Sequence, residues 1–128
     1  MSRFTFKNTY LEGLKIIKRK PIVDERGYLE RIFCINELKP IIGQRKIVEI
    51  NHTLTKKKGT IRGMHFQKLP HTEMKLVSCL RGELFDVAID IRKNSPTFLK
   101  WHAEILNDYI KITEKELIQE RDSVLDLL

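Results

Sequence analysis

The chain has 128 residues, with 24 Lys and Arg against 17 Asp and Glu, which gives a formal net charge of +7. That length fits one domain that buries about two thirds of its unfolded surface, so folding needs no disulfide framework. Cys34 and Cys79 lie in apolar runs with no pairing pattern, which is typical of reduced core thiols. No window approaches the roughly 20 apolar residues of a bilayer span, and no signal-peptide core precedes the first strands. The sequence therefore predicts a soluble, cytoplasmic protein without a membrane partner.

The positive charge is spread along the chain, except for basic runs within residues 15–20 and 56–58. Such an excess favours an anionic ligand, either a small phosphorylated molecule or nucleic acid. The basic residues lack the interleaved aromatic residues of single-strand binders. A nucleic-acid-binding module rests on charge alone and would show DNA binding that depends steeply on salt. We expect no nucleic-acid partner.

The first half of the chain predicts short strands separated by turns. Residues 3–23 alternate loosely and are broken by Pro21, which is typical of edge strands. A turn at residues 24–27 is followed by β-type composition over 28–34, and residues 36–38 predict a helical turn that ends at Pro40. From 46 to 54 the β-branched content rises again, which predicts another strand before a solvated lysine loop.

The second half predicts a hairpin and one further strand. Residues 74–80 and 84–91 are strand candidates joined by a Gly-containing turn, which favours pairing between them. Alternation over 84–91 places Phe85 and Val87 on one face and Asp86 and Ala88 on the other. A last strand is expected over 98–106.

After Leu106 the hydrophobic period changes from two to about 3.6 residues. Thr113 and Glu116 have the spacing of a capping box, so the pattern predicts a C-terminal helix over about 114–127. Many closely spaced short strands and one late helix indicate an all-β antiparallel sandwich or barrel.

Residues 59–67 place a base, a cation and an amide on one short strand whose glycines let a ligand approach the backbone. Removing a proton next to a ketone requires a base and positive charge where the enolate oxygen develops. His65 can be the base, because an imidazole titrates near neutral pH. Lys75 and Arg62 can stabilise the oxyanion, and Asp86 can hold the imidazole in one tautomer.

Strict alternation would place Arg62 and His65 on opposite faces of a strand, so the site requires a bulge near Gly63. His52, His71 and His102 have no comparable local setting. A metal site is not expected, because the sequence has no His-x-His pair with a downstream carboxylate at a recognisable spacing.

Several motifs follow one another in a specific order. They are Asp24-Glu25-Arg26-Gly27, Asn51-His52-Thr53-Leu54, the 59–67 segment, Lys75-Leu76-Val77, the run from Arg81 to Arg92, and Ser95-Pro96-Thr97-Phe98. Together they resemble the dTDP-4-dehydrorhamnose 3,5-epimerase family, which consists of sugar-nucleotide epimerases with a jelly-roll (cupin) fold. The resemblance covers roughly residues 10–106. It implies a cupin-like epimerase domain at 1–106, a jelly-roll barrel incomplete at the C-terminus, and a divergent tail at 107–128.

The resemblance also implies roles for individual residues. His65 would abstract a proton next to the C4 keto group of a dTDP-4-keto-6-deoxysugar in deoxysugar (dTDP-rhamnose type) biosynthesis, with Lys75 and Asp86 in the catalytic site. Arg26 would reach the diphosphate, Arg62 would bind the nucleotide sugar or the enolate, and Asn51 and Gln67 would line the pocket. No cofactor is implied, because the substrate's own keto group acidifies the neighbouring protons. Family members form dimers through strand exchange, so a homodimer is expected.

The chain departs from the family pattern at several positions. Arg31 stands where the family has a glutamate, with Glu30 one place earlier, and Glu49 stands where it has a glutamine. The later family segment, with a tyrosine general acid and an aspartate that pairs with the base, has no counterpart in residues 107–128. Three explanations stay open: a shortened paralogue whose helix covers the missing face, a barrel closed by a partner chain, or a tail read out of frame. The alternative to the epimerase is an inactive paralogue that at most binds a nucleotide sugar or a partner chain.

Overall fold

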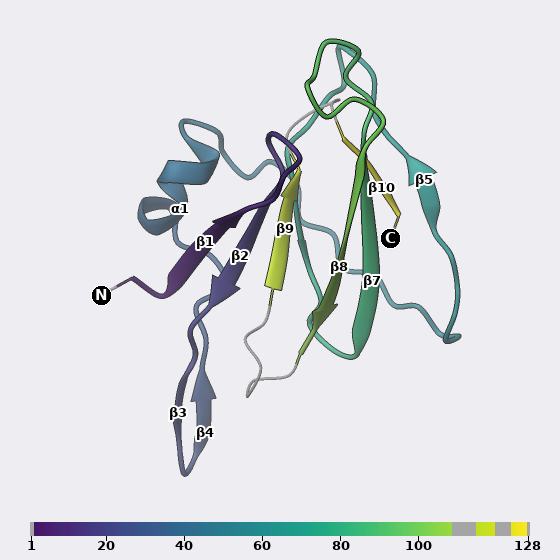
Figure 1. Ribbon diagram of the computed structural model, residues 1–128. Helices are drawn as coiled ribbons and strands as arrows, with labels where there is room; N and C mark the ends of the chain where they lie inside the picture. Colours follow the sequence, from purple (N-terminus) through teal and green to yellow (C-terminus); the bar gives the residue numbers. More distant parts are fainter. Residues whose placement is uncertain (1, 109–114, 120–123, 128) are drawn as a thin grey trace.

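The computed structural model describes residues 2–108, 115–119 and 124–127. In these ranges the chain forms two four-stranded antiparallel sheets, a separate hairpin and one helix (Figure 1). The first sheet has the order β1-β2-β9-β6. Its strands are β1 (Phe4–Asn8), β2 (Lys15–Arg19), β9 (Lys115–Gln119) and β6 (Lys75–Ser78). The second sheet, with the order β5-β10-β7-β8, contains β5 (Gly63–His65), β10 (Val124–Leu127), β7 (Glu83–Asp90) and β8 (Trp101–Asn107). The predicted all-β antiparallel class is confirmed.

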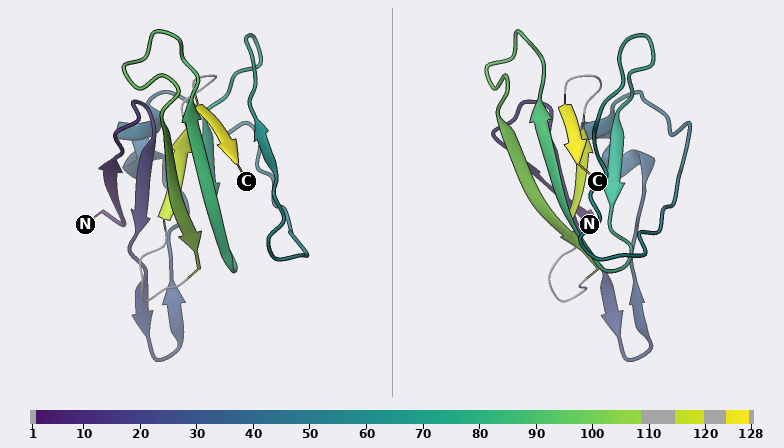
Figure 2. Two further views of the ribbon diagram at one scale, coloured as in Figure 1. Left: turned by 45° about the vertical axis from the view of Figure 1, so that its right-hand side comes forward. Right: turned by 90° about the vertical axis from the view of Figure 1, so that its right-hand side faces the viewer.

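The two sheets pack as layers, which the turned views separate clearly (Figure 2). Ile16 of β2, Ala88 of β7 and Leu106 of β8 are buried in one cluster, together with Leu11, Leu14 and Cys79. This cluster is the core between the sheets, because its members come from both of them. Ile17, the next residue of β2, is buried on the opposite face of the first sheet. Strand β2 is therefore covered on both of its faces, as the two consecutive buried residues Ile16 and Ile17 indicate.

Helix α1 (Ile35–Ile42) covers the outer face of the first sheet. Its buried side chains Leu38, Ile41 and Ile42 pack against Phe4 and Ile17. The prediction that the helix would end at Pro40 is wrong, because burial of the two isoleucines after the proline extends the helix by a further half turn. Gly43 ends it with a φ of 59° and donates its N–H to the Lys39 carbonyl oxygen at 2.8 Å.

A hairpin of β3 (Ile22–Asp24) and β4 (Gly27–Leu29) projects from the end of the sheets (Figure 1). We call it the arm. At its base, Arg19 Nε lies 2.8 Å from Glu30 Oε1, and these side chains are only 1% and 7% exposed. This buried ion pair joins the last residue of β2 to the chain just after β4. The arm is therefore fixed to the first sheet at its root, while its strands pair only with each other among the described elements.

Strands β7 and β8 form the longest ladder, from Glu83 opposite Asn107 to Ile89 opposite Trp101. The predicted division of β7 into two faces is confirmed, since Asp86 and Ala88 are fully buried whereas Phe85 is exposed. The predicted hairpin of 74–80 with 84–91 is wrong, because β6 pairs with β9 while β7 pairs with β8 and β10. The turn at Gly82 carries the chain from one sheet to the other.

The loop that follows β7 is folded around Asp90. Its carboxylate accepts hydrogen bonds from the Arg92 side chain, from Ser95 Oγ and from Thr97 Oγ1 at 2.6 Å. The Phe98 and Lys100 N–H groups bond back to Ser95 and Thr97, so the loop stays a set of turns up to Lys100. The last strand therefore begins at Trp101 and not at the predicted residue 98.

The predicted C-terminal helix over 114–127 is wrong. Within that range, the described residues 115–119 form β9 between β2 and β6, and residues 124–127 form β10 between β5 and β7. A strand placed between two others gains hydrogen bonds on both sides, whereas a helix of this length is marginal in water without packing. The capping residue Thr113 lies outside the described residues. The strand predicted over 46–54 is also absent from the described structure.

Candidate active site

Strand β5 contains a bulge between Gly63 and His65. His65 is opposite Asp126 of β10, and Gly63 is opposite the next residue, Leu127, so Met64 is the extra residue. Because neighbouring positions on β10 face opposite sides, Gly63 and His65 also do. Alternation continued from Gly63 to Arg62, which lies just before β5, would turn Arg62 to the side of His65. The bulge that the site required is present.

Lys75 and Asp86 face the space between the sheets from opposite sides. Lys75 lies four residues before Cys79, which belongs to the inter-sheet core, and two before Val77, which packs against that core. Asp86 is fully buried, two residues before the core residue Ala88. A cation and a carboxylate are thus directed into one interior space by the alternation of two strands.

His65 lies on the edge strand of the sheet that holds Asp86. The register places His65, Asp126, Ala88 and His102 in one row across β5, β10, β7 and β8. At about 4.8 Å per strand, the backbones of His65 and Ala88 are about 10 Å apart. The side chain of His65 is exposed, as expected of a base that a ligand must reach.

The other predicted pocket residues lie in loops that flank β5. Arg62 Nη2 donates to the Leu54 carbonyl oxygen at 3.1 Å, which ties the segment around Asn51 to the beginning of β5. Asn51 Nδ2 donates to Glu49 Oε1 at 2.8 Å. The Glu49 carboxylate is therefore engaged by the neighbouring amide. Gln67 follows β5 and is exposed.

Arg26 stands apart from the other predicted residues, at the tip of the arm (Figure 1). Its guanidinium lies 2.6 Å from Asp24 Oδ2, and both side chains are exposed. The hydrogen bond from the Arg26 side chain holds the pKa of the Asp24 carboxyl below its usual range. Figures 1 and 2 show the arm extending beyond the end of the sheets, away from β5. Within one chain, the structure does not bring Arg26 to His65.

The departures near Arg26 have structural partners. Glu30 forms the buried pair with Arg19, and Arg31 Nη1 lies 2.5 Å from Glu37 Oε2 on α1. The hydrogen bond from Arg31, followed by one from the Arg3 N–H, lowers the pKa of Glu37 to about 2. Glu30 is therefore paired with a cation inside the protein.

Two polar groups were missed by sequence reasoning. His102 Nε2 lies 3.0 Å from Glu104 Oε1, and the Tyr10 ring meets the His102 ring edge-on with centroids 6.2 Å apart. Spacing of two residues on a strand places both side chains on one face and was the available signal. The second group is the cluster around Asp90. It shows that the Ser95-Pro96-Thr97 motif holds the shape of the loop after β7.

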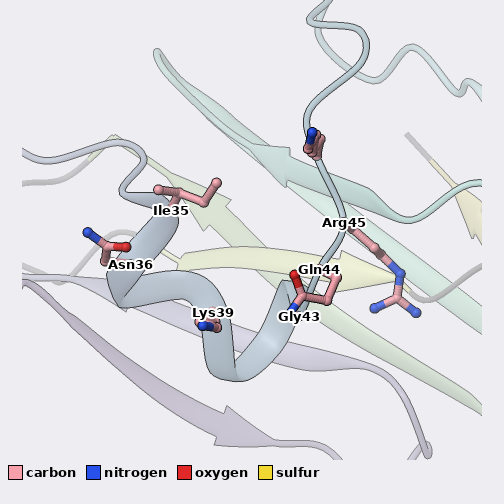
Figure 3. A pocket seen from close by; sticks show the side chains of 7 residues that line it. Ile35, Asn36, Lys39, Gly43, Gln44 and Arg45 are labelled. Carbon is pink, nitrogen blue, oxygen red and sulfur yellow. The ribbon is translucent and has the colours of Figure 1, made fainter.

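A hollow of about 180 Å³ lies beside α1 and is lined by Asn36, Lys39 and the chain that follows the helix (Figure 3). None of the predicted site residues lines it, so it is separate from the candidate site. Within the described ranges, no group of three or more His, Cys, Asp or Glu side chains could hold a metal ion. Helix α1, the helix of the described residues, is far too short to span a bilayer.

Two stacked antiparallel sheets with a histidine, a lysine and a carboxylate on their facing surfaces define a cupin-type domain suited to chemistry on a small polar molecule. The family model described as dTDP-4-dehydrorhamnose 3,5-epimerase matches residues 8–113. The chain belongs to that family.

Relatives with the same description come from diverse organisms. A protein of Sinorhizobium fredii is 38% identical over 96 residues, which are 75% of this chain and 49% of the relative. One of Methanothermobacter thermautotrophicus is 40% identical over 108 residues, which are 84% of this chain and 57% of the relative. The chain thus spans about half the length of the curated relatives it matches.

Solved structures agree with the fold. A 3,5-epimerase of Legionella pneumophila, crystallised with dTDP-4-keto-L-rhamnose, has a TM-score of 0.85 and 34% identity, and covers 97% of this chain and 64% of its own. The epimerase of Bacillus anthracis, with TDP and pyrophosphate bound, has a TM-score of 0.87 and 27% identity over 97% of this chain and 69% of its own.

Proposed function

We propose that this chain supplies the general base, His65, of a dTDP-4-dehydrorhamnose 3,5-epimerase site. In this proposal it acts on a dTDP-linked 4-keto-6-deoxysugar. The observation that carries the proposal is the bulge in β5, from which we infer that Arg62 and His65 face one side. Lys75 and Asp86, which face the adjoining interior, supply further charge. The nucleotide-sugar ligand is supported by the dTDP-4-keto-L-rhamnose bound to the Legionella relative and by the TDP bound to the Bacillus relative.

In this proposal, His65 takes the proton from the carbon next to the C4 keto group. The electron pair of the C–H bond forms the enolate double bond, and the carbonyl π electrons move to the oxygen. Lys75 and Arg62 stabilise that oxyanion as positively charged hydrogen-bond donors. A proton taken from solvent water on the opposite ring face then inverts the carbon as the enolate collapses to the ketone, and His65 releases the proton that it took to solvent. No oxidant, reductant or cofactor enters this balance, because the substrate's keto group makes the C3 and C5 protons removable.

We further propose a homodimer in which the arm of one copy lies against the other. The arm exposes Ile22, Val23, Tyr28 and Leu29 on strands that have no other described partner. A two-stranded hairpin is marginally stable alone, so covering these side chains would stabilise it. The dimer would also bring Arg26 of one copy to the diphosphate bound beside His65 of the other.

A cytoplasmic location is part of the proposal, and the free thiols of Cys34 and Cys79 support it.

The second candidate function is nucleotide-sugar binding without catalysis. The observation that favours it is the TDP and pyrophosphate bound to the Bacillus anthracis relative. The same binding residues would then serve a helper role.

Uptake of deuterium from D₂O at C3 and C5 of dTDP-4-keto-6-deoxyglucose tests the proposed reaction. We expect uptake with the wild-type chain and a decrease of about a hundredfold or more with His65→Asn, because the general base is removed. His71→Asn is the matched control, since His71 is an exposed loop histidine outside the site. Equal uptake by wild type and His65→Asn would overturn the assignment. A thermal shift with dTDP but no uptake would favour the binding function.

Mixing two inactive variants tests the dimer. If Arg26 acts on the partner's site, the Arg26→Ala and His65→Asn variants each have low activity alone. A mixed dimer holds one complete site, in which the intact His65 of one copy meets the intact Arg26 of the other. Activity that returns on mixing supports the shared site. Activity that stays at the sum of the separate variants, with mixed dimers detected by mass spectrometry, places Arg26 outside the partner's site.

A further inference from the structure

The hollow beside α1 is lined by cations and amides. Lys39 lies on the helix, and the chain that leaves the helix adds Arg45 (Figure 3) and then Lys46. Asn36 and Gln44 contribute the two amides, and among the described residues no carboxylate lines the space. Its volume of about 180 Å³ has room for several water molecules and hence for a small polar ligand. The charge of the lining indicates that this ligand is an anion.

Most of the donors around the hollow are not used by the chain itself. Within the described ranges, the side chains of Asn36, Lys39, Gln44 and Lys46 make no hydrogen bond or ion pair. Arg45 is held beside the hollow by its Nη1, which lies 3.4 Å from the Ile42 carbonyl oxygen. An oxyanion would therefore gain charged hydrogen bonds without displacing any that those four side chains make within the protein.

The carboxylates nearest to the hollow in the sequence have other partners. Glu37 lies on α1, where it accepts hydrogen bonds from the Arg31 side chain and from the Arg3 N–H. Glu49 follows the hollow in the chain and accepts a hydrogen bond from Asn51. These contacts tie both carboxylates to groups outside the lining, so the positive charge of the hollow is not cancelled from within it.

The end of α1 is also compatible with an anion. Carbonyl groups at the carboxyl end of a helix carry partial negative charge and would repel an anion. Here the Lys39 carbonyl oxygen accepts the Gly43 N–H at 2.8 Å, and the Ile42 carbonyl oxygen accepts the Arg45 N–H at 3.1 Å. Two of the helix-end carbonyl groups are thus engaged by the same turn that brings Arg45 and Lys46 to the hollow.

We propose that this hollow is a binding site for a phosphate group, carried either by inorganic phosphate or by a small phosphate ester. A phosphate ester has a charge of about −1.5 to −2 at pH 7 and three strong acceptor oxygens, which match three cations and two amides. A carboxylate would offer one charge and two oxygens. None of the candidate active-site residues lines the hollow, so this site goes beyond the proposed function and stands whether or not the chain is an epimerase.

Titration of the ¹⁵N-labelled full chain with inorganic phosphate tests the site, and a parallel titration uses glycerol 3-phosphate. Ionic strength is held constant with chloride, so that general screening does not change. We expect saturable shifts of the amide resonances of residues 43–46 with at least one of the two ligands. The ligand that saturates at the lower concentration identifies the source of the phosphate group.

Three variants locate the binding. Lys39→Gln and Lys46→Gln should each raise the Kd by about tenfold, because each removes one charged hydrogen bond. Asn36→Asp should also raise it, since it puts a carboxylate into the lining. Lys93→Gln is the matched control: it removes the same charge from an exposed lysine outside the hollow and should leave the Kd unchanged. Because all four positions are exposed, circular dichroism should show the wild-type fold in every variant.

Shifts that stay linear in phosphate concentration, or a Kd that is the same in Lys39→Gln, Lys46→Gln and wild type, would show an adventitious ion only and overturn the proposal. Binding that is lost in Lys75→Gln but kept in Lys39→Gln would place the phosphate in the candidate active site and overturn it as well. Deuterium uptake by the sugar is measured separately. Saturable binding at 43–46 without uptake leaves the phosphate site standing and removes the proposed activity, whereas uptake without such binding does the reverse.

Discussion

Asp90 is a fully buried carboxylate whose hydrogen bonds decide the shape of a loop. Burial by itself would raise the pKa of Asp90, but hydrogen bonds from Arg92, Ser95 and Thr97 together outweigh it and hold the pKa below its usual range. The Arg92 guanidinium also donates to the Glu12 carbonyl oxygen, which ties the loop to the turn between β1 and β2. One carboxylate therefore connects the two sheets at this end of the molecule.

We predict that Asp90→Asn lowers the free energy of unfolding by about 3 kcal/mol, because it leaves Arg92 without its buried counter-charge. Urea unfolding followed by circular dichroism measures the change. Asp24→Asn is the matched control, since Asp24 pairs with an arginine at the same spacing but is exposed. Its midpoint should stay at the wild-type value. An equal loss in both variants would show that burial is not the cause.

The Asp90 effect should also depend on pH. Because the folded pKa is below the unfolded value of about 3.9, the stabilisation is fully present above pH 4 and is lost as the pH falls toward the folded pKa. The difference between wild type and Asp90→Asn should therefore shrink in acid. A difference that is constant from pH 7 to pH 2.5 would contradict this assignment.

The residue scale also shows what spacing can predict. The sequence predicts a bulge near Gly63, because a base and a cation on one short strand can serve one site only if they share a side. The register contains a bulge at Met64. Arg26 could not be placed in the same way, since a hairpin's direction depends on the Arg19–Glu30 contact at its root. Nothing local in the sequence marks that pair, whose members are 11 residues apart.

At the scale of elements, the arm depends on that buried ion pair. We predict that Arg19→Met lowers the free energy of unfolding by about 3 to 5 kcal/mol, because Glu30 is then buried without a counter-charge. The double variant Arg19→Met/Glu30→Leu should recover most of the loss, since two apolar side chains carry no uncompensated charge. Thermal and urea unfolding of both variants provide the measurement.

Recovery of the free energy of unfolding in the double variant distinguishes the effect of the buried charge from that of the lost arginine side-chain packing. If Arg19→Met and the double variant are equally unstable, the stem of the arginine matters more than its charge, and the ion-pair account fails. Proteolysis at the arm gives an independent readout, because a released arm is cut faster in the single variant.

Elements differed in how far the sequence could predict them. The faces of β7 followed from period-two alternation, which is a local property. The period of 3.6 residues at Leu117, Ile118, Val124 and Leu125 predicts a helix, yet the same residues form two short strands. Their pairing with β2, β6, β5 and β7 is set by residues up to about a hundred positions away, which no local period contains. For the same reason, the predicted 74–91 hairpin failed.

At the scale of the whole molecule, the last strands hold the two sheets together internally. β9 pairs with β2 on one side and β6 on the other, and β10 does the same for β5 and β7. Among the described strands, β5 has no other partner than β10. The tail, for which the sequence predicts a helix, therefore contributes a central strand to each sheet. The position of His65 depends on it, because β5 pairs with β10.

We predict that a chain truncated after Asp108 loses its cooperative unfolding transition, because both sheets are split and the β5 strand carrying His65 is released. Leu117→Pro in the full chain is the graded comparison. It removes one N–H from the centre of β9, where Leu117 lies between Ile16 and Val77, and should loosen the first sheet only. Hydrogen–deuterium exchange then distinguishes the sheets: amides of β6 should exchange faster in Leu117→Pro while those of β7 stay protected. If the truncated chain unfolds at the wild-type midpoint, the tail strands do not bridge the sheets, and His65 must be held by contacts other than β10.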